Sequence, residues 1–346
     1  MNRDTHARIV AVAAILLFVG AGVAIAQDAR VEYVDGFPEL RKAQGGSDYI
    51  DFGMELQSGD SVVTGRDDFV ELSQGADSSI RVEPDTVFTI REVETSTGRQ
   101  TVMSNSVGSV SYRFGRMTGR EPRIGTSTVV AGVRGTEVTV YAGADGSAMF
   151  LVDSGEVEVT SAGESVSLTE AQGVEVPAGG PPGEVFEIIG RAIDFSTWSG
   201  EKQDEFLADP IGSLRGLEAQ LQDYYGELIV LQSLYTEKRA EYDAAYADLE
   251  DAVEQFGRES REAETIREVV GPLGQEATVL AFNIRYYALT SLSLRRYLLG
   301  QMSVEMKTRY ILDRENPTYT EFVALRDSIL EEYESRITQH LVAVDI

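Results

Sequence analysis

Residues 31–176 alternate apolar and polar side chains with a period of two, in short runs separated by turn-forming residues. Runs such as residues 69–72 and 138–141 place every second side chain on one face, which is typical of half-buried strands. Asp145 and Gly146 stand between two such runs and predict a hairpin turn. Repeated roughly every eight to twelve residues, the pattern predicts an all-β sandwich, roll or solenoid.

Residues 209–342 follow a different pattern, because their apolar positions recur at alternating spacings of three and four. Between residues 214 and 256 every position of this repeat except Lys238 is apolar or aromatic. The predicted seam comprises Leu214, Leu217, Leu221, Tyr224, Leu228, Leu231, Tyr235, Tyr242, Ala245, Leu249, Ala252 and Phe256. A seam of about six heptads predicts a long helix packed on a partner helix, with Asp209 and Pro210 at its start.

The helical region is interrupted at glycine and proline positions. Gly257 ends the seam, and Gly271 followed by Pro272 argues against one uninterrupted helix, so a second helix is predicted over residues 275–312. A third helix is predicted over residues 320–342. These segments predict an antiparallel helical hairpin or a three-helix, coiled-coil-like bundle.

The two long predicted helices carry opposite charge. The first is rich in Glu and Asp, whereas the second contains Arg295 and Arg296 among several bases. Because opposite charges attract across a helix pair, we expect these bases to pair with the acidic first helix. Contact with anionic glycans or lipid headgroups is the alternative.

Residues 176–183 hold three prolines and three glycines, which can continue neither a strand nor a helix. The predicted organisation is therefore α+β in separate domains. A β domain (27–176) precedes a linker and transition segment (177–208), which is followed by a helical domain (209–346). The single tryptophan, Trp198, lies in the transition segment, where it either packs the two domains together or forms a ligand platform.

The first 26 residues read as a secretory signal peptide. Arg3 and Arg8 precede residues 9–26, which are apolar apart from glycine and end in a small-x-small motif at Ala26. Cleavage after Ala26 predicts a periplasmic or secreted protein. An uncleaved N-terminal membrane anchor remains the alternative, because eighteen residues approach the length needed to span a bilayer.

Composition narrows the possible chemistry. The absence of cysteine excludes disulfides, thiolate nucleophiles and cysteine–zinc sites, and only two histidines are present, His6 and His340. Fifty-seven acids against thirty bases give a net charge of −27, which disfavours nucleic-acid binding. We expect no enzyme activity, no cofactor and no dedicated metal site. The acidic turn at residues 66–68 leaves weak divalent-cation binding open as an alternative to a solvated turn.

Two segments of the predicted β domain carry a family resemblance. The first contains Gly59, Asp60, Thr64 and Gly65, and the second contains Arg134, Gly135, Thr136 and Glu137. In this order they resemble the FecR domain, the periplasmic module of bacterial iron-dicitrate-type sensors. The resemblance covers roughly residues 50–176 and implies a β-rich module that contacts other envelope proteins.

In the sensor proteins this module relays a signal from an outer-membrane transporter to a cytoplasmic sigma factor. Here only eight residues precede the apolar run, too few for the cytoplasmic anti-sigma segment, so we do not expect that role to transfer. Arg134 either orders the Gly135 turn for a partner or pairs locally with an acid such as Glu137.

The sequence favours a non-enzymatic, extracytoplasmic interaction protein. Its β module and its helical seam would each bind envelope proteins or a second copy of the chain. The alternatives are a carbohydrate- or siderophore-binding envelope module and, less favoured, a glycan hydrolase with two carboxylates.

Overall fold

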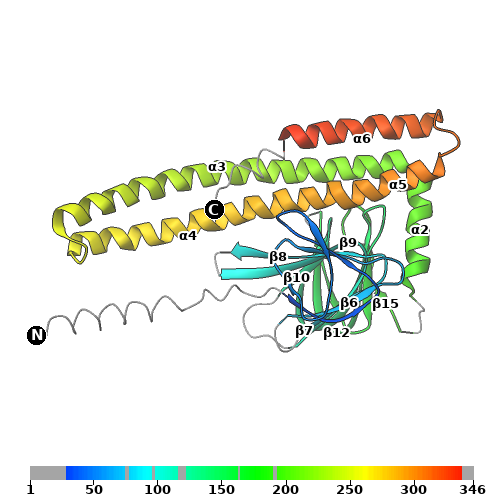
Figure 1. Ribbon diagram of the computed structural model, residues 1–346, viewed down its shortest axis with the longest axis horizontal. Helices are drawn as coiled ribbons and strands as arrows, with labels where there is room; N and C mark the ends of the chain where they lie inside the picture. The colour runs from blue at the N-terminus through cyan, green and yellow to red at the C-terminus, as the bar shows by residue number, and fades with distance from the viewer. Residues whose placement is uncertain are drawn as a thin grey trace, which may run out of the picture.

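The computed structural model describes residues 29–74, 78–95, 98–115, 122–162, 164–189 and 193–336. Its N-terminal part is a mixed sheet of about fifteen strands and its C-terminal part is helical (Figure 1), which confirms the predicted fold class. The predicted signal peptide lies outside the described residues.

The strands form one connected sheet, which we call the β module. Its strands are β1 (Ala29–Asp35), β2 (Glu39–Arg41), β3 (Ser47–Tyr49), β4 (Glu55–Leu56), β5 (Ser61–Val63), β6 (Phe69–Ser73), β7 (Ser78–Val82), β8 (Val87–Thr95), β9 (Gly98–Phe114), β10 (Arg123–Thr126), β11 (Val130–Ala142), β12 (Ala148–Ser161), β13 (Glu164–Thr169), β14 (Gln172–Val176) and β15 (Phe186–Glu187). β9 and β10 pair in parallel, whereas the other ladders are antiparallel.

Three strands are longer than the sequence pattern predicts: β9, β11 and β12 have 17, 13 and 14 residues. β9 pairs with β8 and β10 along its first half and with β11 and β7 along its second half. β9 thus pairs with different strands along its two halves, so the sheet can curl around a common core.

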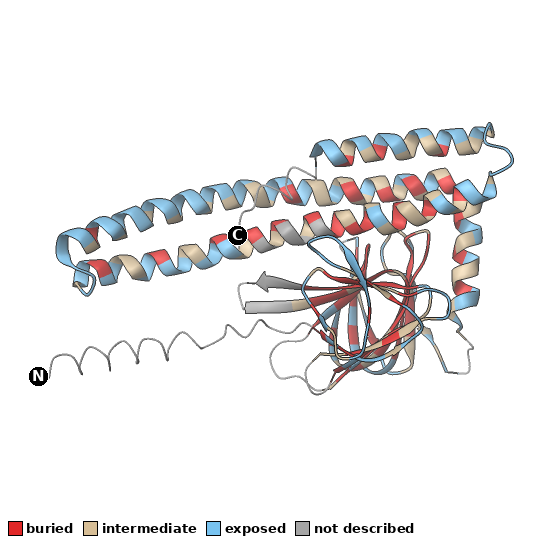
Figure 2. Ribbon diagram, in the orientation of Figure 1, coloured by how far each residue is buried: buried red, intermediate tan, exposed pale blue. Residues whose placement is uncertain are grey.

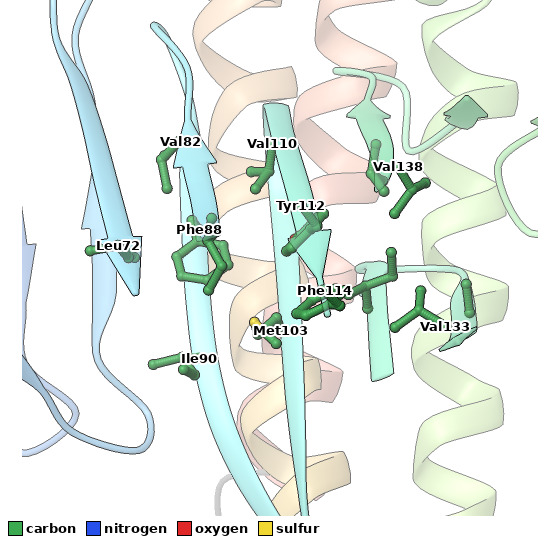
Figure 3. Close-up of a cluster of buried hydrophobic side chains, with 14 of the residues drawn as sticks. Leu72, Val82, Phe88, Ile90, Met103, Val110, Tyr112, Phe114, Val133 and Val138 are labelled. Carbon is green, nitrogen blue, oxygen red and sulfur yellow. The ribbon is translucent and has the colours of Figure 1, made fainter. Parts of the chain in front are cut away.

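The alternation of apolar and polar residues in the sequence corresponds to alternating burial along the strands. Along β7, Ser78, Ile80 and Val82 are buried while the residues between them are more exposed. Side chains from neighbouring strands, including Phe88 and Tyr112, meet Ile80 and Val82 in one buried cluster, part of which is shown in Figure 3.

The helical part comprises α2 (Phe195–Ala208), α3 (Pro210–Phe256), α4 (Arg261–Ser293), the π-helical segment η1 (Leu294–Leu298), α5 (Leu299–Arg309) and α6 (Pro317–Arg336). α3 begins as predicted, because the Asp209 carboxylate accepts a hydrogen bond from Gly212 N and proline occupies the first helical position. We call α3 and α4 together the helical arm. Tyr242 packs on Gly274 and Lys238 pairs with Glu276, so the two helices are antiparallel.

The predicted start of the second helix was wrong. α4 begins at Arg261, fourteen residues before the predicted start, and continues through Pro272. Proline removes one backbone hydrogen bond, but Ala263 and Val270 before it and Ala277 after it are buried. We attribute the continuity to this packing against α3, which overrides the local helix-breaking signal.

The later helical boundaries also differ from the prediction. The segment predicted to run to residue 312 changes to π-helix at η1 and ends at Arg309. α6 begins at Pro317 rather than Thr320, because proline is tolerated in the first turn of a helix. The predicted end of this helix, residues 337–342, lies outside the described residues.

Candidate functional site

The first segment of the FecR resemblance closes a loop. The buried Asp60 carboxylate accepts hydrogen bonds from Ala43 N at 2.9 Å and Gln57 N at 3.0 Å. Gly59 has φ +91°, and a Cβ there would lie 2.8 Å from the Cβ of Ala43. Glycine is therefore required by both backbone conformation and space.

Thr64 and Gly65 fix the following turn. The Thr64 hydroxyl donates to Glu83 O at 2.6 Å and accepts from Thr86 N at 2.9 Å. Gly65 N donates to a carboxylate oxygen of Asp68 at 2.8 Å. All these contacts join parts of the chain to each other, so they stabilise the fold directly.

The second segment lies where the backbones of the paired strands β11 and β12 approach each other closely, at a shift in their register. Thr136, 1% exposed, donates to Glu156 O and accepts from Arg134 N. Gly135 and Gly155 both have positive φ, and a Cβ on Gly155 would lie 2.5 Å from Gly135 O. The backbones therefore approach too closely for a side chain.

Glu137 forms an ion pair with a base on β9. Its carboxylate lies 2.8 Å from the guanidinium of Arg113. The Arg134 side chain is exposed. The ion pair links two strands that are neighbours in the sheet. Arg113 is 70% exposed, so the pair adds little to stability.

Trp198 packs α2 against the β module. It is 5% exposed and lies 5.7 Å from Tyr141 of β11, ring centroid to ring centroid. Met149 and Leu151 of β12 complete this small cluster. This agrees with the packing role rather than with an exposed ligand platform. On the same helix Lys202 pairs with Glu175 of β14, which adds an ionic contact between α2 and the sheet.

Asp194 caps the start of α2. Its carboxylate accepts hydrogen bonds from the Ser196 hydroxyl and from Thr197 N, which lower its pKa to about 2. The cap therefore favours the ionised carboxylate.

The helical arm is joined to the β module by buried and partly buried polar contacts that the sequence did not indicate. Arg91 of β8, 7% exposed, donates to Thr290 Oγ1 at 3.1 Å and Ser293 Oγ at 2.6 Å, both on α4. Tyr224 of α3 donates to Ser127 O at 2.8 Å. These residues lie about 100 to 200 positions apart, so no local pattern could have paired them.

The arm consists of two parts with different burial. In the proximal arm (210–228 and 284–293), Leu214, Leu217, Leu221 and Leu228 are buried in a core shared with α5 and α6. In the distal arm (229–256 and 261–283), the predicted seam residues Leu231, Tyr235, Tyr242 and Leu249 are only half-buried, and Phe256 is 54% exposed. The distal arm extends past the β module and is largely exposed (Figures 1 and 2).

Exposed apolar side chains recur along the distal arm. They are Ile229, Val230, Leu234, Tyr246, Phe256 and Val269, with exposed fractions from 43% to 55%. The distal arm also carries eleven acids and four bases, so its surface combines apolar side chains with net negative charge. This combination makes the distal arm the candidate interaction site.

The predicted charge pairing with the acidic first helix was wrong for Arg295. Among the described side chains, α3 and α4 are joined by an ion pair with the base on α3, Lys238, and the acid on α4, Glu276. Arg295 instead pairs with Glu334 of α6 at 3.1 Å and lies over the ring of Tyr333. The acid that pairs with Arg295 therefore comes from α6 and not from α3.

The described residues hold neither a metal-binding cluster nor a membrane-spanning helix. No group of three or more histidine or carboxylate side chains is placed to hold a metal ion. None of the described helices combines the length and apolar character needed to cross a membrane.

No family model and no curated protein matches the chain. Two crystal structures of a “putative anti-sigma factor” from Parabacteroides distasonis are similar in structure, at 15% and 16% identity and a TM-score of 0.32. Each match covers 41% of this chain and 64% of that protein, so the chain spans less than two thirds of its length.

Proposed function

We propose that this chain is a non-enzymatic, extracytoplasmic interaction protein whose distal arm contacts envelope proteins or a second copy of the chain. The observation that carries this proposal is the row of exposed apolar side chains on the distal arm. Complete burial of a large apolar side chain contributes roughly 1.5 to 3 kcal/mol of favourable free energy. A row of exposed apolar side chains therefore favours association with a partner that covers it.

The β module serves in this proposal as the rigid base that holds the arm. Arg91 and Tyr224 join the proximal arm to the sheet, which leaves the distal arm extended. The resemblance to the FecR domain, carried by Gly59, Asp60, Thr136 and Gly135, supports a place among envelope proteins. The leader sequence supports export, with the mature chain starting at Gln27.

Site-specific photo-crosslinking in the producing cell tests the proposal. A photoreactive residue at Leu234 or Val269 should give crosslinks to another protein or to a second copy. The control position is Glu331 on α6, which is exposed and charged and should give few. N-terminal sequencing of the same exported protein should begin at Gln27. Equal crosslinking from the control position, or none from the distal arm, would contradict the role of the arm.

Leu228 is not a suitable position for this test, although it belongs to the predicted seam. It is fully buried, so a polar residue there would disrupt the helix pair rather than its surface. Leu234→Ser changes an exposed position instead and should preserve the circular dichroism spectrum. With the photoreactive residue at Val269, a loss of crosslinks in that variant together with an unchanged spectrum would support the surface role.

A further inference from the structure

Four aromatic side chains stand exposed on the first loops and strands of the β module. Phe37 is 82% exposed, Tyr49 74%, Phe52 67% and Tyr33 49%. They lie within twenty residues of the sequence, and we call them the aromatic cluster. They are separate from the distal arm and from both segments of the FecR resemblance.

Hydrogen bonds fix the loops that carry the aromatic cluster. Phe37 N donates to Asp68 Oδ1 at 2.9 Å, and Gly36 before it has φ +81°. Ile50 N donates to Pro38 O and Gly53 N donates to Val31 O, both at 2.9 Å. These bonds tie the loop after β3 to β1 and to the turn before β2, so the backbone segments that carry the four aromatic residues lie next to one another.

One part of the aromatic cluster is already stacked. Tyr33 lies on Phe69 with ring centroids 5.3 Å apart, and the Arg81 guanidinium lies 4.3 Å from the Phe69 centroid. This stack holds Tyr33 at a fixed angle while half of its surface stays exposed. Ordered and exposed aromatic side chains lose little conformational entropy when a partner covers them.

Charged residues around the aromatic cluster are predominantly acidic. Between residues 30 and 67 the exposed acids are Glu32, Asp35, Asp48, Asp51, Glu55 and Asp67, and the exposed bases are Arg30, Lys42 and Arg66. Lys42 is paired with Asp48 at 2.5 Å. Six exposed acids against three exposed bases give the segment that carries the aromatic cluster a net negative charge. Exposed aromatic side chains on a charged segment resemble one side of an interface with an apolar core and a charged rim.

We propose that the aromatic cluster is a second docking surface, which binds a protein segment with apolar anchor residues flanked by lysine or arginine. Apolar anchors would cover Phe37 and Phe52, and the basic residues would face the acidic rim. A second copy of this chain, or an anionic lipid surface, would bring like charge to the same rim. The proposal goes beyond the proposed function, because it concerns the β module and not the arm.

The test uses the mature chain, residues 27–346, and an array of twelve-residue peptides. Each peptide combines two Phe, Leu or Trp anchors with three Lys or Arg residues at varied spacing. Matched peptides carry Glu in place of the bases or Ser in place of the anchors. We expect binding to a subset of the first set, at least tenfold weaker after either replacement, and weakening with added salt.

Variants connect that binding to the aromatic cluster. Phe37→Ser combined with Phe52→Ser should weaken it at least tenfold, with an unchanged circular dichroism spectrum because both side chains are exposed. Val304→Ser combined with Leu312→Ser removes exposed apolar residues from the helical part and should leave binding unchanged. Leu234→Ser, which tests the arm, should also leave it unchanged, so the two proposals can fail separately.

Several results would overturn the docking surface. These are equal binding of the Glu peptides, no binding of any peptide, or binding that survives the double phenylalanine substitution. Concentration-dependent dimers that disappear in the same variant would identify a second copy as the occupant instead. Flotation with phosphatidylglycerol vesicles that depends on Phe37 and Phe52 would identify a lipid surface.

Discussion

The proximal and distal arms share one sequence repeat but differ in how deeply it is buried. Leu221 and Leu228 of the proximal arm lie in a core that also receives Met302 from α5 and Phe322 from α6. Leu249 in the distal arm is half-buried in a two-helix contact. A heptad repeat therefore shows which face of a helix turns inward, but not how many other elements cover that face.

The strongest test of this comparison is truncation of one seam leucine in each part. Leu228→Ala should lower the free energy of unfolding by about 3 kcal/mol, because the side chain is fully buried and leaves a cavity. Leu249→Ala should lower it by about 1 kcal/mol, since part of its surface is already in water. Urea denaturation followed at 222 nm measures both, and equal losses would remove the distinction between proximal and distal arm.

The next largest effect is expected from replacing Pro272, which should stabilise α4. It lies inside α4, where proline disfavours a helix by up to about 3 kcal/mol. Pro272→Ala should therefore slow amide hydrogen exchange over residues 261–283. Pro210→Ala is the matched control, because proline in the first turn of α3 removes no helical hydrogen bond and its replacement should change exchange little. Unchanged exchange in the first variant would mean that packing already compensates fully for the proline.

The sequence predicted the two regions well because each rests on a local repeat. Period-two alternation identified the strands, and the three-four spacing identified α3 and its inward face. The start of α4 was missed because a helix-breaking pair was read locally, whereas burial of residues such as Ala277 is a tertiary effect. The partner of Arg295 was missed for the same reason, since nothing in the sequence places α6 beside it.

The candidate sites were predictable to different degrees. The residues of the FecR resemblance were selected from the sequence pattern, but the contacts that they make, such as Asp60 with Ala43, required the structure. The seam was predicted, but its exposed distal flank at Leu234 was not, because exposure depends on where α6 and the sheet end. The aromatic cluster has no sequence signal beyond the residue types, because loop hydrogen bonds such as Ile50 N to Pro38 O create it.

Substitution of Arg91 tests whether the stability of the proximal arm depends on its contacts with the β module. Arg91→Ala removes the hydrogen bonds to Thr290 and Ser293 and should lower the free energy of unfolding by roughly 1 to 3 kcal/mol. Amide exchange in α4 near residue 290 should rise at the same time. Arg113→Ala removes an exposed ion pair with Glu137 and should change the stability by less than about 1 kcal/mol. Similar losses in both variants would argue against a specific joint at Arg91.

The smallest predicted effect concerns Asp194, which caps the helix between the sheet and the arm. Its pKa is lowered from 3.8 to about 2, chiefly by the Ser196 hydroxyl and by the Thr197 backbone and hydroxyl. A carboxyl group with a lowered folded-state pKa stabilises the fold above its ordinary pKa, and this contribution is lost as the pH falls towards 2. Asp194→Ala should therefore lower the melting temperature by a few degrees at pH 7, in the range typical of a lost helix cap. The difference from the unmodified protein should shrink between pH 4 and pH 2.

Asp204→Ala is the matched control for this pH dependence, because it removes an exposed carboxylate from the same helix without removing the cap. Its melting temperature should follow that of the unmodified protein at every pH. If the two variants lose the same number of degrees, the effect comes from net charge and the cap at Asp194 is not responsible. If Asp194→Ala alone is affected, and its difference from the unmodified protein shrinks as the pH falls from 4 to 2, the ionised cap helps hold α2 in place between the sheet and the proximal arm.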